Sequence, residues 1–197
     1  MKIQLASSNP GKLREYRELA VGSAFEIELL PAISELPPFD ESAPTFAENA
    51  LGKALHFSRY TNEVVLADDS GVVVPALGGE PGVRSARYAG PNATDADNVQ
   101  KLLREMADKE ADARRARFVC VIAIARQGRA LVIASDFVDG SITNEPRGRN
   151  GFGYDPVFYF SDIGRTSAEI SSQEKNRRSH RGKVFCKVRE YLAPMNF

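Results

Sequence analysis

The stretch that decides the fold is residues 116–138, ARFVCVIAIARQGRALVIASDFV. Two long apolar runs, 116–126 and 129–138, lie on either side of the pair Gln127-Gly128. Apolar runs separated by such a pair are typical of a β-hairpin with a tight turn. The hairpin predicts two adjacent antiparallel strands, which argues against a purely parallel, doubly wound sheet.

Outside the hairpin, short apolar segments alternate with segments of helical periodicity. We predict strands at 2–6, 25–30, 64–67, 72–75 and 156–160, and helices at 10–20, 45–60, 93–107 and 171–191. Mixed helices and strands, together with a long hairpin, indicate a mixed α/β or an α+β fold. Because the chain shows no repeat and no Gly/Ser linker, residues 1–197 are expected to form a single domain.

The chain has 197 residues, a mass of 21.6 kDa, and a formal net charge of zero from 26 basic and 26 acidic side chains. A nucleic-acid or membrane-surface binder is normally basic, so we expect neither partner. No apolar run approaches the ~20 residues that span a bilayer, and the first residues lack the apolar core of a secretory signal. We therefore predict a cytoplasmic protein.

Two cysteines and two histidines are too few for a disulfide scaffold or for a zinc site built from these residues. Cys120 lies in the apolar run FVCVI, and we expect both Cys120 and Cys186 to be core residues. No pattern indicates a nucleophilic cysteine or a serine–histidine–aspartate triad.

The motif Ser7-Ser8-Asn9-Pro10-Gly11-Lys12 lies between the first predicted strand and the first predicted helix. Asparagine is a good helix N-cap, and proline suits the first helical turn. A helix start attracts anions, and a first-turn lysine is unfavourable unless it faces one. The motif indicates either a phosphate site or a plain capped helix with a solvated lysine. It is not a Walker A loop.

The motif Asp68-Asp69-Ser70-Gly71 follows the apolar strand predicted at 64–67. Adjacent carboxylates at the carboxyl end of a strand repel each other unless a cation or a proton intervenes. Magnesium prefers one or two carboxylates together with substrate phosphates. The pair therefore indicates a metal-binding or catalytic role, and the alternative is a β-turn with solvated aspartates.

The segment Thr45-Phe46-Ala47-Glu48 begins the second predicted helix with the pattern of a capping box. Lys53 lies about two turns further on, where it either faces phosphates or, as the pattern alone favours, is solvated. The acidic pair Asp40-Glu41 precedes this helix in a proline-rich loop. It is expected at the surface, and the alternative is a further carboxylate ligand for the metal.

Residues 148–156 read GRNGFGYDP, with a glycine on each side of Phe152. An exposed aromatic ring is a natural platform for a nucleotide base, and the alternative is a tight turn with an inward ring. The tail from 173 to 189 carries seven basic residues against one acidic residue, Glu174. Such a run binds phosphates or carbonyl oxygens, or, as is more usual, forms a solvated helix face.

Together, these motifs resemble the inosine triphosphate pyrophosphatase family, which hydrolyses aberrant purine nucleoside triphosphates. The resemblance follows the chain in order over the segments 7–12, 45–54, 67–71, 78–88, 152–155 and 179–182. Each motif is weak alone, and their common order makes the match specific. The resemblance implies an elongated fold of two lobes around a long mixed β-sheet, with a central cleft, and a homodimer.

The resemblance also assigns roles to matching residues. It implies that the triphosphate is held by Ser7, Ser8, Asn9, Pro10, Gly11 and Lys12. It implies that Asp69 is the general base and a ligand of Mg²⁺, with Asp68 and Glu41 near the metal, and that Lys53 and Ser70 contact the substrate. The implied nucleoside pocket consists of Phe152, Gly153, Tyr154, Asp155, Lys175, His180 and Arg181.

The implied reaction is attack of water at the α-phosphate of ITP, dITP or XTP, which gives a monophosphate and pyrophosphate. Donors such as His180 and Arg181 suit the 6-keto oxygen of these bases and leave the amino group of adenine unpaired. Two rivals stay open: a pyrophosphatase of modified pyrimidine triphosphates on a similar fold, and a non-enzymatic nucleotide or RNA binder, which the basic tail motivates.

Overall fold

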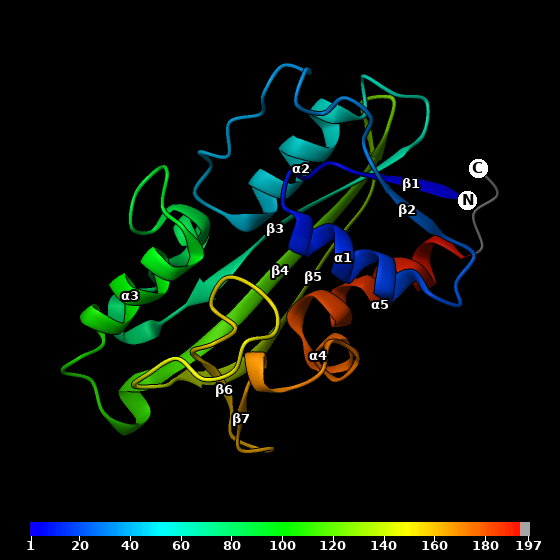
Figure 1. Ribbon diagram of the computed structural model, residues 1–197. Coiled ribbons are helices and arrows are strands. Elements are labelled where there is room, and N and C mark those ends of the chain that lie inside the picture. Colours follow the sequence, from blue (N-terminus) through cyan, green and yellow to red (C-terminus); the bar gives the residue numbers. More distant parts are fainter. Residues whose placement is uncertain (194–197) are drawn as a thin grey trace. The chain divides into compact units, whose positions relative to one another are not determined.

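The computed structural model describes residues 1–193 and contains a seven-stranded mixed β-sheet (Figure 1). The strands are β1 (Lys2–Leu5), β2 (Glu26–Leu29), β3 (Val64–Val73), β4 (Arg115–Arg126), β5 (Arg129–Ile142), β6 (Phe158–Phe160) and β7 (Arg165–Thr166). Their order in the sheet is β2-β1-β3-β4-β5-β6-β7. Strand β1 pairs with β2 and β3 in parallel, whereas β6 pairs with β5 and β7 in antiparallel fashion. The predicted mixed α/β class is confirmed.

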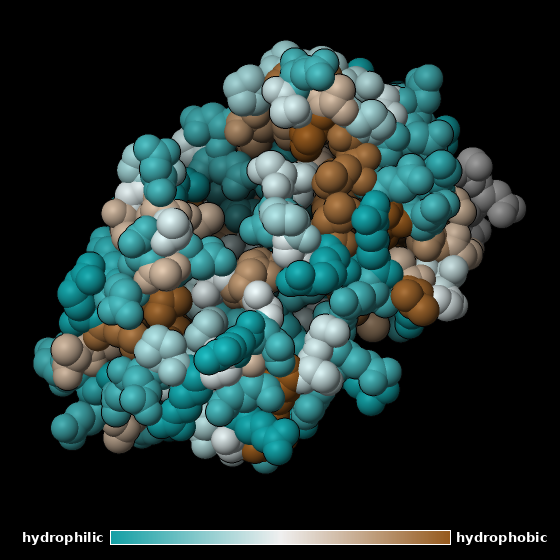
Figure 2. All heavy atoms as spheres, viewed as in Figure 1, coloured by the Kyte–Doolittle hydropathy of each residue, from teal (hydrophilic) through white to brown (hydrophobic). Residues whose placement is uncertain are grey.

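The α-helices are α1 (Pro10–Ala20), α2 (Phe46–Phe57), α3 (Asp95–Glu105), α4 (Ser172–Arg178) and α5 (His180–Leu192). The bounds predicted for the first helix are confirmed. Within residues 1–193, no helix combines the length and the apolar character that a membrane span requires. On the face shown in Figure 2, hydrophilic side chains predominate, as expected for a chain with 26% charged residues.

The predicted hairpin joins β4 to β5. Gln127 and Gly128 both have positive φ, 49° and 75°, as a type I′ hairpin turn requires. Strand β5 continues four residues beyond its predicted end and reaches Ile142.

The chain folds into two compact units. The first unit contains Met1–Asp69, Cys120–Asp136 and the described chain from Arg181 onward, and the second contains Ser70–Val119 and Phe137–His180. The expectation of one domain with two lobes around a cleft stays a prediction.

In the first unit, alternate side chains of the strands face different helices. Leu66 of β3 packs in one apolar cluster with α1 and α5, whereas Ala67 packs in another with α2. Since successive side chains of a strand point to opposite faces, α1 and α5 cover one face of the sheet and α2 covers the other. Figure 1 shows α1 beside α5, and the rings of Tyr16 and Phe185 join them with centroids 5.8 Å apart.

In the second unit, the apolar core lies between α3 and the strands. Val99 and Leu102 of α3 pack in the same cluster as Phe118 of β4 and Phe158 of β6. The two phenylalanine rings are 4.2 Å apart between centroids. Tyr154, a predicted site residue, belongs to the same cluster.

Strand β3 is longer than the sequence predicts. The sequence predicts a strand at 64–67, a turn, and a second strand at 72–75, whereas one strand covers Val64–Val73. The two aspartates therefore lie within a continuous strand, and both the β-turn alternative and the placement at a strand's carboxyl end are wrong.

Gly71 serves close packing in this strand. A Cβ atom on Gly71 would lie 2.3 Å from Ser85 Oγ and 2.4 Å from the carbonyl oxygen of Gly82. The Val72 N–H donates to Ser85 Oγ (3.0 Å), so β3 and the 3₁₀ turn Gly82–Arg87 lie in direct contact. Glycine is needed because of this approach.

The C-terminal segment forms two helices, which corrects the single helix predicted at 171–191. The break is at Ser179, whose dihedral angles are extended (φ −67°, ψ 155°). Serine favours helix ends because its side chain competes for backbone hydrogen bonds. The break separates His180 and the rest of α5 from α4.

Only one cysteine is a core residue. Cys120 is buried as expected, but Cys186 is exposed, which contradicts its predicted core position. Val184 and Val188 form the buried face of α5, and Cys186 lies midway between them on the other side of the helix.

We predict that Gly71→Ala lowers the free energy of unfolding by about 2 kcal/mol or more, because the methyl group overlaps a backbone carbonyl. Gly22→Ala is the control. Its methyl group meets open space, so only the backbone strain of its positive φ, about 1 kcal/mol, is expected. Urea unfolding of both variants measures the difference, and equal losses would contradict the packing role of Gly71.

Candidate active site

Asp68 and Asp69 lie on opposite faces of β3. Asp68 continues the row of Leu66, which faces α1 and α5, and Asp69 continues the row of Ala67, which faces α2. The two carboxylates therefore have different neighbours, although they are adjacent in the sequence.

The Asp68 carboxylate is fully buried and pairs with two cations. Its Oδ1 lies 3.0 Å from Lys12 Nζ, and its Oδ2 lies 3.3 Å from Arg181 Nη2. Arg181 Nη1 in turn donates to Glu15 Oε2 (2.5 Å). Two cations and two carboxylates thus form one buried network in which the formal charges balance.

This network fixes the charge of Asp68. Burial raises the pKa of the Asp68 carboxyl, but the surrounding cations, Lys12 first among them, hold it well below its usual range. Burial lowers the pKa of Arg181, but the carboxylate of Glu15 and then that of Asp68 raise it well above its usual value. Asp68 is therefore ionised at neutral pH and serves to hold cations in place.

The turn before α1 is ordered by its own side chains. Asn9 is the N-cap, and its Oδ1 accepts from the N–H groups of Gly11 (2.8 Å) and Lys12 (3.2 Å). The Asn9 N–H donates to Ser7 Oγ (3.2 Å), and Ser7 is buried, whereas Ser8 and Pro10 are exposed. Lys12 reaches Asp68, so the alternative of a solvated lysine is wrong.

Asp69 faces polar groups of α2 and of the loop before it. Asn49 Nδ2 donates to Asp69 Oδ2 (3.0 Å). Lys53, one turn further along α2, pairs with Glu41 (Nζ–Oε1 2.5 Å). Lys53 is only 6% exposed, so the solvated position favoured by its pattern is wrong. Glu41 is partly buried, whereas its neighbour Asp40 is exposed.

The protonation of Asp69 differs from that of Asp68. Burial raises the pKa of Asp69 to about 6; the hydrogen bond from Asn49 acts against this rise, and the charge of Glu41 adds to it. A carboxyl group with a pKa near neutrality can exchange protons at physiological pH. Of the two aspartates, Asp69 is therefore the one suited to act as a general base.

The oxygen atoms near Asp69 suit a hard cation. Within residues 1–193, no three His, Cys, Asp or Glu side chains gather into a group that could hold a metal ion by themselves. Mg²⁺ needs only one or two protein carboxylates when substrate phosphates and water complete its shell. Asp69 and Glu41 match that number, whereas Asp68 is occupied by cations. The metal roles of all three residues stay predictions.

In the second unit, Asp155 organises the turn around Phe152. Asp155 Oδ2 accepts from the Phe152 N–H (2.8 Å) and from Lys175 Nζ. The Lys175 ammonium lies 4.8 Å from the centroid of the Phe152 ring, within cation–π range. Gly151 has φ 79°, and a Cβ atom there would lie 1.9 Å from Asp155 Oδ2. The Phe152 ring stays partly exposed, as a stacking platform requires.

Tyr154 and His180 are held by packing in the same unit. The buried Tyr154 hydroxyl donates to the carbonyl oxygen of Ser85 (2.8 Å). The His180 ring stacks on Phe118, with centroids 4.6 Å apart and an interplanar angle of 11°. Both side chains therefore have fixed orientations.

The structure separates the basic tail into buried and exposed residues. Lys175, His180 and Arg181 are 5%, 4% and 2% exposed, so for them a solvated helix face is the wrong interpretation. Arg177 and Lys183 are exposed, as that interpretation predicts.

The predicted site residues form three groups. Lys12, Asp68 and Arg181 form the first, Glu41, Lys53 and Asp69 the second, and Phe152, Asp155 and Lys175 the third. Arg181, predicted for the nucleoside pocket, directs both Nη atoms at carboxylates. Ser70 follows Asp69 on β3 and is partly buried.

Sequence reasoning missed three polar partners of these groups. Glu15 pairs with Arg181, Asn49 donates to Asp69, and Asp95 Oδ2 accepts from the Gly153 N–H (2.7 Å). A charged or amide side chain on the buried face of a helix is the signal that identifies Glu15 and Asn49. No local signal identifies Asp95, because it lies exposed in the first turn of α3.

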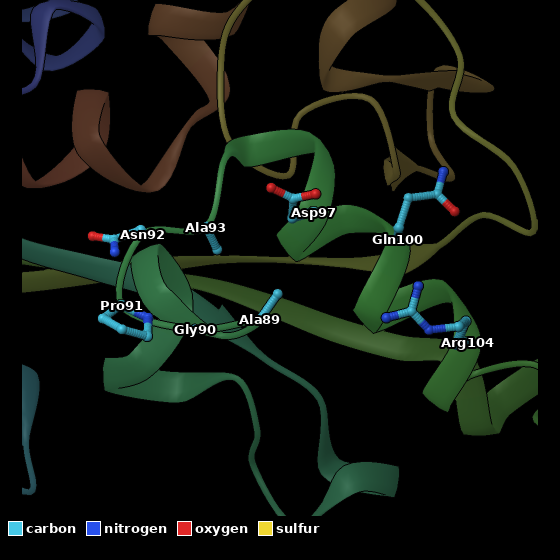
Figure 3. A pocket seen from close by; sticks show the side chains of 8 residues that line it. All are labelled: Ala89, Gly90, Pro91, Asn92, Ala93, Asp97, Gln100 and Arg104. Carbon is cyan, nitrogen blue, oxygen red and sulfur yellow. The ribbon is translucent and has the colours of Figure 1, made fainter.

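A separate pocket of about 480 Å³ lies in the second unit, between the loop before α3 and α3 itself (Figure 3). It is lined by Ala89, Gly90, Pro91, Asn92, Ala93, Asp97, Gln100 and Arg104. None of these is a predicted site residue. Asp97 is used to cap α3, since its carboxylate accepts from the Thr94 N–H (2.9 Å).

Comparison with known proteins gives one consistent result. The model of the Ham1 family matches residues 3–191. A dITP/XTP pyrophosphatase of Geobacillus kaustophilus is 47% identical over 189 residues, which cover 96% of this chain and 93% of the relative. The dITP/XTP pyrophosphatase of Bacillus subtilis is 40% identical over 188 residues, 95% of each chain.

Solved structures agree with these sequences. A HAM1 protein from Coxiella burnetii superposes with a TM-score of 0.86 at 41% identity and covers 99% of this chain and all of its own. The Ham1 protein of Staphylococcus aureus gives a TM-score of 0.84 at 35% identity and covers 98% of both chains. The predicted mixed α/β fold is therefore confirmed along nearly the whole chain.

The raised pKa of Asp69 predicts how stability depends on pH in a buffer with a metal chelator. Well below pH 4 the carboxyl is protonated in both the folded and the unfolded state. Between pH 4 and 6 only the unfolded state loses this proton, so stability falls as pH rises, by an amount on the order of 2 kcal/mol.

Asp69→Asn should remove this loss, so the variant is more stable than wild type above pH 6 and gains nothing below pH 4. Thermal unfolding from pH 3.5 to 7.5 measures the difference. Asp97→Asn is the control of opposite sign. Hydrogen bonds with Thr94 lower the pKa of Asp97, so the loss of the Asp97 charge lowers stability at neutral pH. A pH-independent difference between wild type and Asp69→Asn would contradict the assignment.

Proposed function

The chain belongs to the Ham1 family, and from this premise we propose that it is a nucleoside-triphosphate pyrophosphatase acting on non-standard purine nucleotides. It hydrolyses ITP, dITP and XTP to the monophosphate and pyrophosphate and so removes them from the nucleotide pool. The observation that carries the proposal is the buried Asp69, whose pKa lies near neutrality, close to Glu41 and Lys53 in a chain similar throughout to dITP/XTP pyrophosphatases.

Asp69 is the general base in this reaction. It accepts a proton from a water molecule whose oxygen attacks the α-phosphorus. The bond from that phosphorus to the bridging oxygen breaks, and pyrophosphate leaves with the bond's electrons. In the metal-free protein the pKa of Asp69 is about 6, so this carboxyl group is largely ionised at neutral pH and can take up a proton.

Mg²⁺ is the cofactor that fits this donor set. Asp69 and Glu41 would hold it, and Asp68 is a further predicted ligand. Held there beside a nucleotide, the ion would supply neutralisation of phosphate charge and a lower pKa of bound water. The ion pair with Lys53 holds Glu41 against α2, so a carboxylate and an ammonium group lie together near Asp69.

The start of α1 supplies the triphosphate contacts. We assign them to Ser7, Ser8, Asn9, Pro10, Gly11 and Lys12, with Ser70 and Lys53 as further substrate contacts. The buried ion pair with Asp68 holds the Lys12 ammonium at a defined place, and a cation positioned in advance stabilises the charge that develops on the phosphates.

The second group of contacts recognises the nucleoside. Phe152 offers a ring face for stacking, and the hydrogen bonds of Asp155 hold the turn that presents it. Gly153, Tyr154, Lys175, His180 and Arg181 complete the predicted pocket. Donors from this set bind the 6-keto oxygen, and a base with a 6-amino group leaves them unpaired. Guanine shares the keto oxygen, so its rejection depends on the 2-amino group.

We also propose that the protein acts in the cytoplasm, where free nucleotides are used, and as a homodimer. The family resemblance supports both statements. In the described part of the chain both cysteines are free thiols, which is consistent with a reducing compartment.

The proposed activity predicts a substrate order. With Mg²⁺, the protein should release pyrophosphate from ITP, dITP and XTP much faster than from ATP, dUTP or dTTP, and no activity should remain in chelator. Asp69→Asn should lose about a thousandfold or more in kcat while staying folded. Preference for dUTP or dTTP would favour a pyrimidine enzyme, and tight binding without turnover would favour a nucleotide sensor.

Lys12→Ala should raise KM for dITP and lower kcat by about 10- to 100-fold, because it removes a cation from both the bound and the transition state. Lys2→Ala is the matched control, since Lys2 forms an exposed pair with Glu28 (3.3 Å). Initial rates over a range of dITP concentrations separate the two constants. A Lys12→Ala profile equal to that of Lys2→Ala would exclude the phosphate contact.

A further inference from the structure

Asn49 is a fully buried amide near the start of α2. A buried amide is costly unless its donor and acceptor groups are used. Its Oδ1 accepts from the Ala43 N–H (3.0 Å), and its Nδ2 donates to the Ala43 carbonyl oxygen (3.3 Å) and to Asp69 Oδ2 (3.0 Å). The side chain therefore links α2, the loop before it, and β3.

These partners fix the orientation of the amide. The Ala43 N–H is a donor and can face only Oδ1, so the two N–H bonds of Nδ2 point to the Ala43 carbonyl and to Asp69. A reversed amide would set donor against donor and oxygen against carboxylate. Asp69 therefore meets a donor of fixed direction.

The same amide holds the loop that carries Glu41. Ala43 lies two residues after Glu41, and Glu41 is tied to α2 by its pair with Lys53. Both ends of the segment 41–43 are thus attached to α2, and the amide that attaches one end also contacts Asp69. One side chain therefore contacts both Asp69 and the segment that carries Glu41.

We propose that Asn49 is a positioning residue of the hydrolysis: it orients the Asp69 carboxylate and holds the Glu41 segment in register with it. This inference rests on the proposed function, which gives the two carboxylates their roles. Residues that orient a metal-binding or catalytic group typically contribute about 10- to 100-fold in activity.

Asn98 provides a matched control elsewhere in the chain. Like Asn49, it is a buried asparagine four residues after a threonine N-cap. Its Oδ1 accepts from the Ala89 N–H (2.8 Å), and its Nδ2 donates to the Ala86 carbonyl oxygen (3.1 Å). Asn98 thus clamps a loop to a helix in the same way, with two backbone groups as its hydrogen-bond partners.

Kinetics separate positioning from folding. Asn49→Leu, of similar volume and without polar atoms, should lower kcat for dITP about 10- to 100-fold while KM changes less than about threefold. Both variants should lower the Tm by similar amounts, because each loses the hydrogen bonds of a buried amide. Asn98→Leu should nevertheless keep kcat within about threefold of wild type. Equal losses of kcat in the two variants would overturn the proposal.

A second pair of variants guards against misfolding of the first. Asn49→Asp keeps the shape and the acceptor for the Ala43 N–H, but it removes the donor and sets a second carboxylate against Asp69. It should lose at least as much kcat as Asn49→Leu, whereas Asn98→Asp should retain activity. Normal kcat in Asn49→Asp would count against the proposal.

A double-mutant cycle tests the contact without any substrate. The unfolding constants are measured in a buffer with a metal chelator. The change in the double variant Asn49→Leu/Asp69→Leu should differ about fivefold or more from the product of the changes in the two single variants. For Asn98→Leu/Asp69→Leu, the change should equal that product. An additive Asn49–Asp69 cycle would overturn the inference. Failure of wild type to hydrolyse dITP and XTP would instead overturn the proposed function, and the cycle would still report on Asn49.

Discussion

The alternation of side chains along β3 is the constraint on which the site depends. Neighbouring residues of a strand face opposite sides, so Asp68 and Asp69 meet different partners. Asp68 meets the cations Lys12 and Arg181, and Asp69 meets the amide of Asn49. One carboxylate consequently stays ionised, while burial brings the pKa of the other near neutrality. Environments that separate two carboxyl groups in this way suit them to separate tasks, here a charge anchor and the proposed proton acceptor.

Buried ion pairs recur in both compact units. Asp68 and Arg181 are paired inside the first unit, and Asp155 and Lys175 inside the second. Removing two charges from water costs several kcal/mol per ion, so apolar side chains of similar volume would serve stability as well. Their placement fits the proposed ligand, because a triphosphate and a polar base need cations and donors whose directions are set before binding.

Asn49 and Asn98 occupy equivalent positions in their helices, but only Asn49 contacts a carboxylate of the candidate site. Asn49 and Asn98 each follow a threonine cap by four residues and each clamp a backbone segment. Only the surroundings differ, because the helix of Asn49 packs on the face of β3 that presents Asp69. A carboxylate opposite the amide turns a structural clamp into a contact with the proposed base.

The sequence by itself determined the features that depend on neighbours along the chain. The cap at Asn9, the bounds of the first helix at 10–20 and the hairpin turn at Gln127-Gly128 were predicted, since each involves residues a few positions apart. The order of the motifs also identified the family. Only the tertiary structure decided the burial of Lys53, the separation of the two aspartates and the close approach at Gly71. These depend on partners outside the local element: Asp68 and Arg181, for example, are 113 residues apart. Periodicity reports which side of an element is apolar, but burial and pKa follow from distances to atoms that other elements bring.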